Sequence, residues 1–123
     1  MENVLMIAPT LELTTERTSP WSRVISVSGE LDRMGAPRLR RALGEQMADD
    51  RVRQLIVDLS DVEFMDGGGL RLLLETSEAM RASGRRFCVV CTNQHVLRLF
   101  TLIDARGRLQ VVRSRSALQD AIA

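Results

Sequence analysis

One stretch of the chain, from Val52 to Leu74, constrains the fold more than any other. It runs from an apolar burst at residues 55–57, through a second apolar pair at 64–65, to Asp66 and three consecutive glycines, after which a leucine-rich helical pattern begins. The apolar burst predicts a buried strand, and the later spacing predicts a helix. Asp66 suits the N-cap of that helix, because a short carboxylate accepts backbone N–H groups of the first turn. We expect this turn to carry whatever surface the protein presents to other molecules.

The rest of the chain alternates between strand and helix patterns. The sequence predicts strands at residues 11–15, 24–28, 54–58, 87–91 and 109–112, and helices at 36–47, from the glycine turn to a stop at 83–84, at 94–102 and at 116–122. The order β-β-α-β-α-β-α-β-α implies right-handed crossovers and a mixed, mostly parallel sheet of about five strands, with four helices and an opening antiparallel hairpin. We therefore expect one α/β domain over residues 11–122 and a weakly patterned lead-in over residues 1–10.

The pattern also makes finer predictions about these elements. Gly29 is expected to end the second strand, and Ser60 and Asp61 are expected to lie in a solvated loop. Ser114 or Ser116 is expected to cap the last helix. The inward stripes of the second and third helices are expected to comprise Leu70, Leu73, Leu74, Ser77 and Met80, and Val96, Leu99, Phe100 and Ile103.

Composition narrows the class of protein. With 123 residues, 45% of them hydrophobic and 27% charged, the chain has the make-up of one globular domain. The formal net charge is +1, from 17 basic and 16 acidic residues, so no bulk field attracts the chain to nucleic acid or to a membrane. No apolar run is long enough for a membrane span, and the first residues lack the pattern of a signal peptide. A cytoplasmic protein is the expectation.

Two cysteines, Cys88 and Cys91, resemble a redox or metal-binding pair only in their spacing. They lie on a predicted strand, where residues three apart point to opposite faces, so their sulfur atoms should not meet. No second cluster of cysteine or histidine completes a zinc site. We interpret both residues as buried thiols.

The chain shows no pattern of catalytic side chains. The single histidine, His95, has no nucleophile or carboxylate in a recognisable arrangement around it. The glycine turn has some likeness to a phosphate-binding loop, but Leu70 and Arg71 follow where a P-loop requires lysine and serine or threonine. Leu72 likewise replaces the last glycine of a dinucleotide fingerprint. From these residues we expect no enzyme activity, no cofactor and no metal.

Three segments together resemble the STAS domain of bacterial anti-sigma factor antagonists. They are VSGELD at 27–32, VDLSDVEFMDGGGL at 57–70 and VLRLF at 96–100. The resemblance covers roughly residues 11–122, in order and with family-like spacing, and the element order read from periodicity agrees with that fold. It implies a protein that docks on an anti-sigma factor, itself a serine kinase of the GHKL ATPase type, and so frees a sigma factor for transcription.

The resemblance also implies a switch that this chain lacks. The family carries a phosphorylated serine directly after the aspartate of a D-S-[ST]-G-L motif. Asp66, Gly69 and Leu70 match that motif, but Gly67 occupies the phosphoacceptor position and Gly68 the second hydroxyl position. Phosphate on the family serine would repel the partner by adding charge at a packed interface. Gly67 cannot be phosphorylated, so the antagonist is always active, is regulated by another signal, or is a degenerate domain kept for another contact.

The resemblance places the docking surface around the turn. Asp32 matches an acidic position near the family's switch, although it could equally cap the loop before the first helix. Two alternatives remain open: a STAS accessory subunit of a lipid-transport ATPase or stress-signalling complex, and a phosphate- or nucleotide-binding STAS domain. The residues expected to bind a partner are Asp32, Asp66, Gly67, Gly68, Gly69, Leu70 and Arg71.

Overall fold

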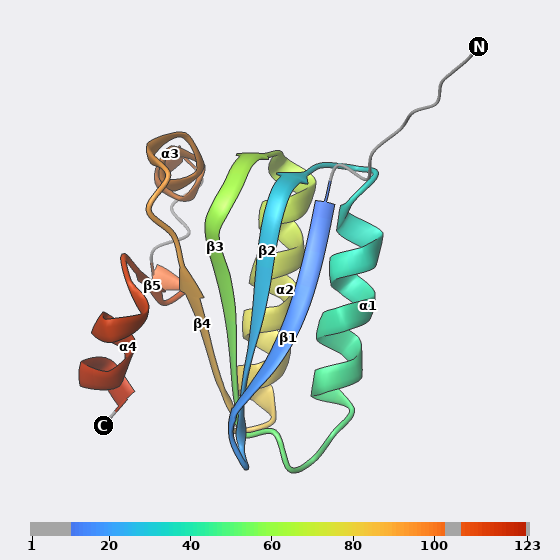
Figure 1. Ribbon diagram of the computed structural model, residues 1–123, viewed down its shortest axis with the longest axis vertical. Coiled ribbons are helices and arrows are strands. Elements are labelled where there is room, and N and C mark those ends of the chain that lie inside the picture. The colour runs from blue at the N-terminus through green and yellow to red at the C-terminus, as the bar shows by residue number, and fades with distance from the viewer. Residues whose placement is uncertain (1–10, 103–106, 123) are drawn as a thin grey trace.

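A five-stranded sheet, in the order β1-β2-β3-β4-β5, organises the computed structural model, which describes residues 11–102 and 107–122 (Figure 1). The predicted lead-in over residues 1–10 and the predicted inward position of residue 103 lie outside the described residues. The strands are β1 (Leu11–Ser19), β2 (Ser22–Leu31), β3 (Gln54–Met65), β4 (Arg86–Val90) and β5 (Val111–Val112), and the helices are α1 (Ala36–Met47), α2 (Gly67–Ala82), α3 (Gln94–Leu102) and α4 (Arg115–Ile122).

The pairing of the strands confirms the predicted mixed α/β architecture. β1 and β2 form an antiparallel hairpin, whereas β2, β3, β4 and β5 run parallel. Parallel neighbours require a crossover, and α1, α2 and α3 supply the three connections. The carboxyl ends of β2, β3 and β4 therefore meet at one edge of the sheet, where α1, α2 and α3 begin. This edge holds the glycine turn.

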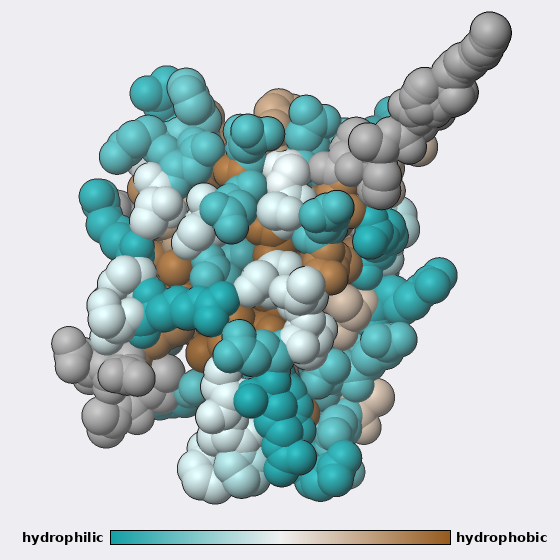
Figure 2. Space-filling view, in the orientation of Figure 1, coloured by the Kyte–Doolittle hydropathy of each residue, from teal (hydrophilic) through white to brown (hydrophobic). Residues whose placement is uncertain are grey.

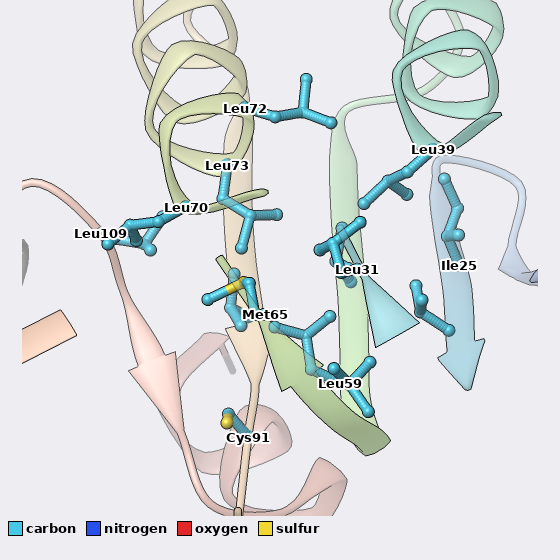
Figure 3. Packing of buried hydrophobic residues seen from close by; sticks show 14 of the residues in the cluster. Ile25, Leu31, Leu39, Leu59, Met65, Leu70, Leu72, Leu73, Cys91 and Leu109 are labelled. Carbon is cyan, nitrogen blue, oxygen red and sulfur yellow. The ribbon is translucent and has the colours of Figure 1, made fainter. Parts of the chain in front are cut away.

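The main hydrophobic core lies between the sheet and two helices. Figure 1 shows α1 and α2 side by side on one face of the sheet, and we call this the inner face. Figure 3 shows Leu73, Met65 and Leu31 gathered between α2 and the strands, with Leu72 and Leu39 in the space between the two helices. All five side chains are buried. This packing fixes the start of α2 over the ends of β2 and β3.

The outer face of the sheet is more polar and carries α4. A smaller cluster of Val24, Ile56, Cys88, Val90 and Leu118 joins α4 to the strands. In Figure 2 this face is mostly teal and white, with brown surface showing between the polar side chains. Its apolar contact area is small, so polar contacts contribute more to holding α4.

Arg115, the first residue of α4, fastens that helix to three strands. Its guanidinium lies 2.7 Å from Asp58 Oδ2, donates to Ser26 Oγ at 2.8 Å, and lies 3.4 Å from Glu16 Oε1. Partial burial raises the pKa of Asp58, but hydrogen bonds from Ser60 and Arg115 outweigh that effect, so the pKa is below its usual value. Ser114 Oγ accepts from Ala117 N and caps α4, as predicted for one of two serines.

Two predictions about strand ends were wrong. Gly29 does not end β2 but lies within it, at φ 99°, and β3 continues to Met65, so Ser60 and Asp61 are exposed strand residues and not loop residues. The pairing of β2 with β3 shifts register twice in this region. Each shift breaks the alternation of buried and exposed residues that marks a regular strand, and this removed the periodic signal.

The two cysteines lie on opposite faces of the sheet, as predicted from their spacing of three residues on a strand. Cys88 belongs to the outer cluster and Cys91 to the inner core, and both thiols are free and buried. Burial raises the pKa of the Cys88 thiol to about 11 and also raises the pKa of the Cys91 thiol. Both residues are therefore structural at neutral pH.

Candidate functional site

The turn between β3 and α2 begins with Asp66, which is the N-cap predicted from the sequence. Its Oδ1 accepts a hydrogen bond from Gly69 N at 3.0 Å, and its backbone N–H donates to Leu31 O at 3.2 Å. The first contact satisfies a free donor of the first helical turn, and the second ties the turn to the end of β2. Both ends of the turn are therefore held in place by the domain itself.

The three glycines that follow have different surroundings. A Cβ atom added at Gly69 would lie 2.8 Å from Met65 Cγ and 2.9 Å from Leu31 Cγ, closer than packed atoms allow. At Gly68 the nearest atom would be Asp66 Oδ1, at 3.3 Å, and at Gly67 no atom would lie within 4 Å. Gly69 is thus required by the packing of α2 on β2 and β3. Gly67 and Gly68 are exposed and leave bare backbone at the surface.

Asp32 lies beside this turn, because Leu31 of β2 pairs with Met65 of β3 and each strand ends in an aspartate one residue later. Asp32 Oδ1 accepts from the backbone N–H groups of Met34 and Gly35, both at 3.0 Å. The side chain therefore caps the loop that leads into α1, which was one of the two roles expected for it. It remains partly exposed at the same edge as Asp66.

The structure divides the seven predicted binding residues into two groups. Gly69 and Leu70 are buried, and Leu70 packs in the main core, so these two support the turn from inside. Gly67, Gly68 and Arg71 are exposed, and the partly exposed Asp32 and Asp66 stand beside them. The accessible part of the candidate site therefore consists of Asp32, Asp66, Gly67, Gly68 and Arg71.

Two apolar residues at the same edge were missed by the sequence reasoning. Met34, in the loop after β2, is 81% exposed, and Phe64, next to the end of β3, is 51% exposed. Large apolar side chains on a surface mark binding sites when they gather beside other candidate contacts. Phe64 could have been noticed, because it breaks the polar alternation of its strand. No local signal distinguishes Met34 from a buried methionine.

Most charged side chains at this edge of the sheet are acidic. Carboxylates outnumber arginines over the last residues of β2 and β3 and the turns that follow, although the chain as a whole is nearly neutral. The acidic residues of this edge are Glu30, Asp32, Asp61, Glu63 and Asp66, and the basic ones are Arg33 and Arg71. We call the exposed Met34, Phe64, Gly67 and Gly68, together with these charged neighbours, the docking face.

The other candidate groups are either exposed on another element or already hydrogen-bonded within the turn. His95 is exposed on α3, which Asn93 caps by accepting from the N–H groups of His95 and Val96. An anion at the start of α2 would meet the carboxylate of Asp66, which already accepts from Gly69 N; this disfavours a phosphate site at the turn. Within the described ranges, no group of three His, Cys, Asp or Glu side chains could hold a metal ion, and no helix is both long and apolar enough to cross a membrane.

The fold and the turn define a class of protein. The family model described as "Mlab, STAS domain" matches residues 14–113, and the chain belongs to the STAS domain family. This confirms the resemblance and the fold predicted from the sequence.

Its relatives narrow the class further. The chain is 37% identical over 99 residues to the anti-sigma-F factor antagonist RsfB of Mycobacterium tuberculosis, covering 80% of this chain and 77% of that protein. It is 29% identical over 87 residues to an anti-sigma-B factor antagonist of Staphylococcus aureus, covering 71% of this chain and 80% of that protein. These relatives are bacterial regulatory binding proteins, and they favour the antagonist interpretation over both alternatives.

Solved structures agree with this fold. The crystal structure of an anti-sigma factor antagonist from Mycobacterium paratuberculosis has a TM-score of 0.85 and 30% identity, covering 95% of this chain and 98% of that one. The antagonist SpoIIAA in its unphosphorylated form has a TM-score of 0.75 and 19% identity, covering 89% and 96%, and it supports the fold alone.

Proposed function

We propose that this STAS domain, over residues 11–122, is an anti-sigma factor antagonist that binds its partner through the docking face and acts by binding alone. The observation that carries the proposal is the open Gly67–Gly68 backbone beside the exposed Met34 and Phe64, in a chain 37% identical to an antagonist. Bare backbone permits close approach of another protein, and apolar anchors supply the area that an interface core needs.

The proposed partner is an anti-sigma factor of the GHKL serine kinase type. The docking face indicates what the binding surface of the anti-sigma factor should contain. It should have an apolar depression that accepts Met34 and Phe64. Lysine or arginine side chains around that depression should meet the acidic residues of the docking face. Such complementarity speeds association and excludes partners with an acidic surface. The protein would act in the cytoplasm, where an anti-sigma factor has access to its sigma factor.

The proposed regulation differs from that of a phosphorylated antagonist. Position 67 carries no hydroxyl, so a kinase partner has nothing to modify there. The hydroxyls nearest in sequence are on Ser60, in β3, and on Thr76, which is buried in α2 and donates to Leu72 O at 2.8 Å. Neither stands at the start of α2. The wild-type turn would therefore keep its affinity when the kinase is active.

The first experiment places a charge on the open glycine. Gly67→Glu should leave the fold intact, because no atom lies within 4 Å of the added Cβ. It should weaken binding of the cognate anti-sigma factor by at least about tenfold, measured by calorimetry, because the new side chain fills the space in which the partner approaches the bare backbone. Gly44→Glu is the matched control, since Gly44 is an exposed glycine of α1 with equally open surroundings. Equal affinity of the two variants would remove the turn from the interface.

A second experiment restores the missing hydroxyl. Gly67→Ser should fit the same open space, bind the anti-sigma factor without ATP, and lose that binding once ATP is added, because phosphate places charge in the interface. Mass spectrometry of the intact 61–75 segment should find phosphate on the variant and none on the wild type. Phosphate on the wild-type segment would contradict the proposed regulation, and an unmodified variant would contradict the kinase class of the partner.

A further inference from the structure

We propose that the hollow between α3 and residues 109–113 binds a small organic anion, one that carries a phosphate or carboxylate group on an apolar body. The hollow has a volume of about 570 Å³, within the range typical of small-molecule sites. It shares no residue with the docking face, and the proposal does not depend on the proposed function.

The positive charge of the side chains that line the hollow favours binding of an anion. Arg98 of α3 and Arg113, just after β5, both line the hollow, and no carboxylate of the described residues lines it. Neither guanidinium makes a hydrogen bond or ion pair in the described part of the chain, whereas Arg115 and Arg40 each pair with a carboxylate. Two cations that share one hollow repel each other, and an anion with two or more oxygen atoms relieves that repulsion through paired N–H donors.

The apolar lining of the hollow favours a ligand that has a carbon body beside its charged group. The half-buried Leu97 and Val111 present apolar surface to the hollow, and Phe100 and Leu109, only 2% and 3% exposed, join that lining to the main core. Inorganic phosphate would leave this apolar surface wet. An anion with a flat or branched carbon body would cover it and gain about 25 cal/mol for each Å² of apolar surface buried.

Two side-chain amides complete the lining. Gln94 and Gln110 line the hollow from its two sides, Gln110 lines the smaller hollow as well, and neither side chain makes a hydrogen bond in the described residues. An amide both donates and accepts, so these groups suit hydroxyl or carbonyl oxygens on the ligand body. An apolar lining with a few polar and charged groups is the usual arrangement of a site for a small charged ligand.

A smaller hollow, of about 180 Å³, does not carry the same inference. Arg85 lines it, but that guanidinium already donates to Val52 O at 3.2 Å, to Met47 O at 3.0 Å and to Ser83 Oγ at 2.8 Å. Its donors hold the ends of α1 and α2 together. The larger hollow differs because Arg98 and Arg113 make no such hydrogen bonds within the described residues.

The test is a titration of the full chain, followed by proton–nitrogen correlation NMR, with phenyl phosphate, benzoate and inorganic phosphate as probes. Phenyl phosphate or benzoate should shift the signals of residues 94–101 and 109–113 saturably, and the better of the two should bind at least about tenfold more tightly than inorganic phosphate, because the ring covers the apolar floor. Tighter binding of phenyl phosphate would assign a phosphate ester, and tighter binding of benzoate a carboxylate.

Variants separate this hollow from a general surface effect. Arg98→Gln and Arg113→Gln should each weaken the better probe by roughly tenfold, because each removes one charged donor pair. Arg41→Gln, on the exposed side of α1, is the control and should leave the affinity unchanged, as should Gly67→Glu. Shifts that do not saturate, shifts centred outside the two segments, or equal affinities in all variants would overturn the site.

Discussion

Gly67 and Gly69, at the two ends of the glycine triplet, are the same type of residue, but the space around them differs. An added Cβ at Gly69 would meet Met65 Cγ and Leu31 Cγ at less than 3 Å, whereas one at Gly67 would meet no atom within 4 Å. Packing inside the domain explains why residue 69 has no side chain, but it does not explain why residue 67 has none. A run of identical residues can therefore combine one glycine that the domain's packing requires with another that it does not require.

The largest effect is expected at Gly69. Gly69→Ala forces a methyl group against Leu31 and Met65, and overpacking of a core typically costs about 1–3 kcal/mol. Chemical denaturation should show a lower midpoint with an unchanged slope. A midpoint equal to that of the wild type would mean that the core can yield at this point, and the contrast between the two glycines would disappear.

The next effect should concern binding and not stability. Phe64→Ala removes a half-exposed ring from the docking face, so the free energy of unfolding should stay within about 0.5 kcal/mol of the wild type. Affinity for the anti-sigma factor should fall by at least about tenfold, since exposed aromatic anchors carry much of an interface's energy. Trp21→Ala is the control, because Trp21 is 57% exposed at the opposite edge of the sheet. Equal losses in both variants would argue against a localised face.

Asp66 joins the two ends of the turn, and its loss should have an intermediate effect. Asp66→Ala removes the acceptor of the Gly69 N–H, and loss of an N-cap costs about 1 kcal/mol. Thermal unfolding should detect this, while Asp66→Asn should retain most of the stability because an amide oxygen still accepts. If both variants melted alike, the carboxylate charge and not the hydrogen bond would be responsible.

The smallest effect is expected at Gly67, and its sign is opposite to that at Gly69. Gly67→Ala adds a side chain to open space at a residue with ordinary backbone angles, which should stabilise the domain by about 0.4–1 kcal/mol by restricting the unfolded chain. Denaturation measured beside Gly69→Ala would give the comparison directly. A loss of stability would show that the fold itself needs the bare backbone at position 67, so the open glycine would no longer indicate an outside partner.

The sequence predicted the framework of the fold because its helices have strong local signals. The range of α3 and the N-cap of α2 were read correctly, since apolar spacing and a capping aspartate act within a few residues. The carboxyl ends of β2 and β3 were missed because register shifts there interrupt the alternation that identifies a strand. β5, expected at 109–112, is a strand only at Val111–Val112.

The candidate site was predicted only in part. Asp66 and the glycines were found from the motif, but the division between buried Gly69 and Leu70 and exposed Gly67 and Gly68 depends on how α2 seats against β2, which lies far away in sequence. Met34 was missed because exposure of an apolar side chain is a property of the assembled surface, and Phe64 was missed although its place in the strand pattern gave a local signal. The hollow beside α3 was missed because it brings together residues from two separate segments.

The bare backbone at position 67 has a consequence for how a cell could control this protein. A residue without a hydroxyl keeps no record of earlier kinase activity, so phosphorylation at position 67 cannot divide the copies of the chain into active and inactive forms. The share of anti-sigma factor that it captures would then follow from the amounts of the two proteins and their dissociation constant. Transcription and proteolysis of the antagonist itself would set both the strength and the timing of the response.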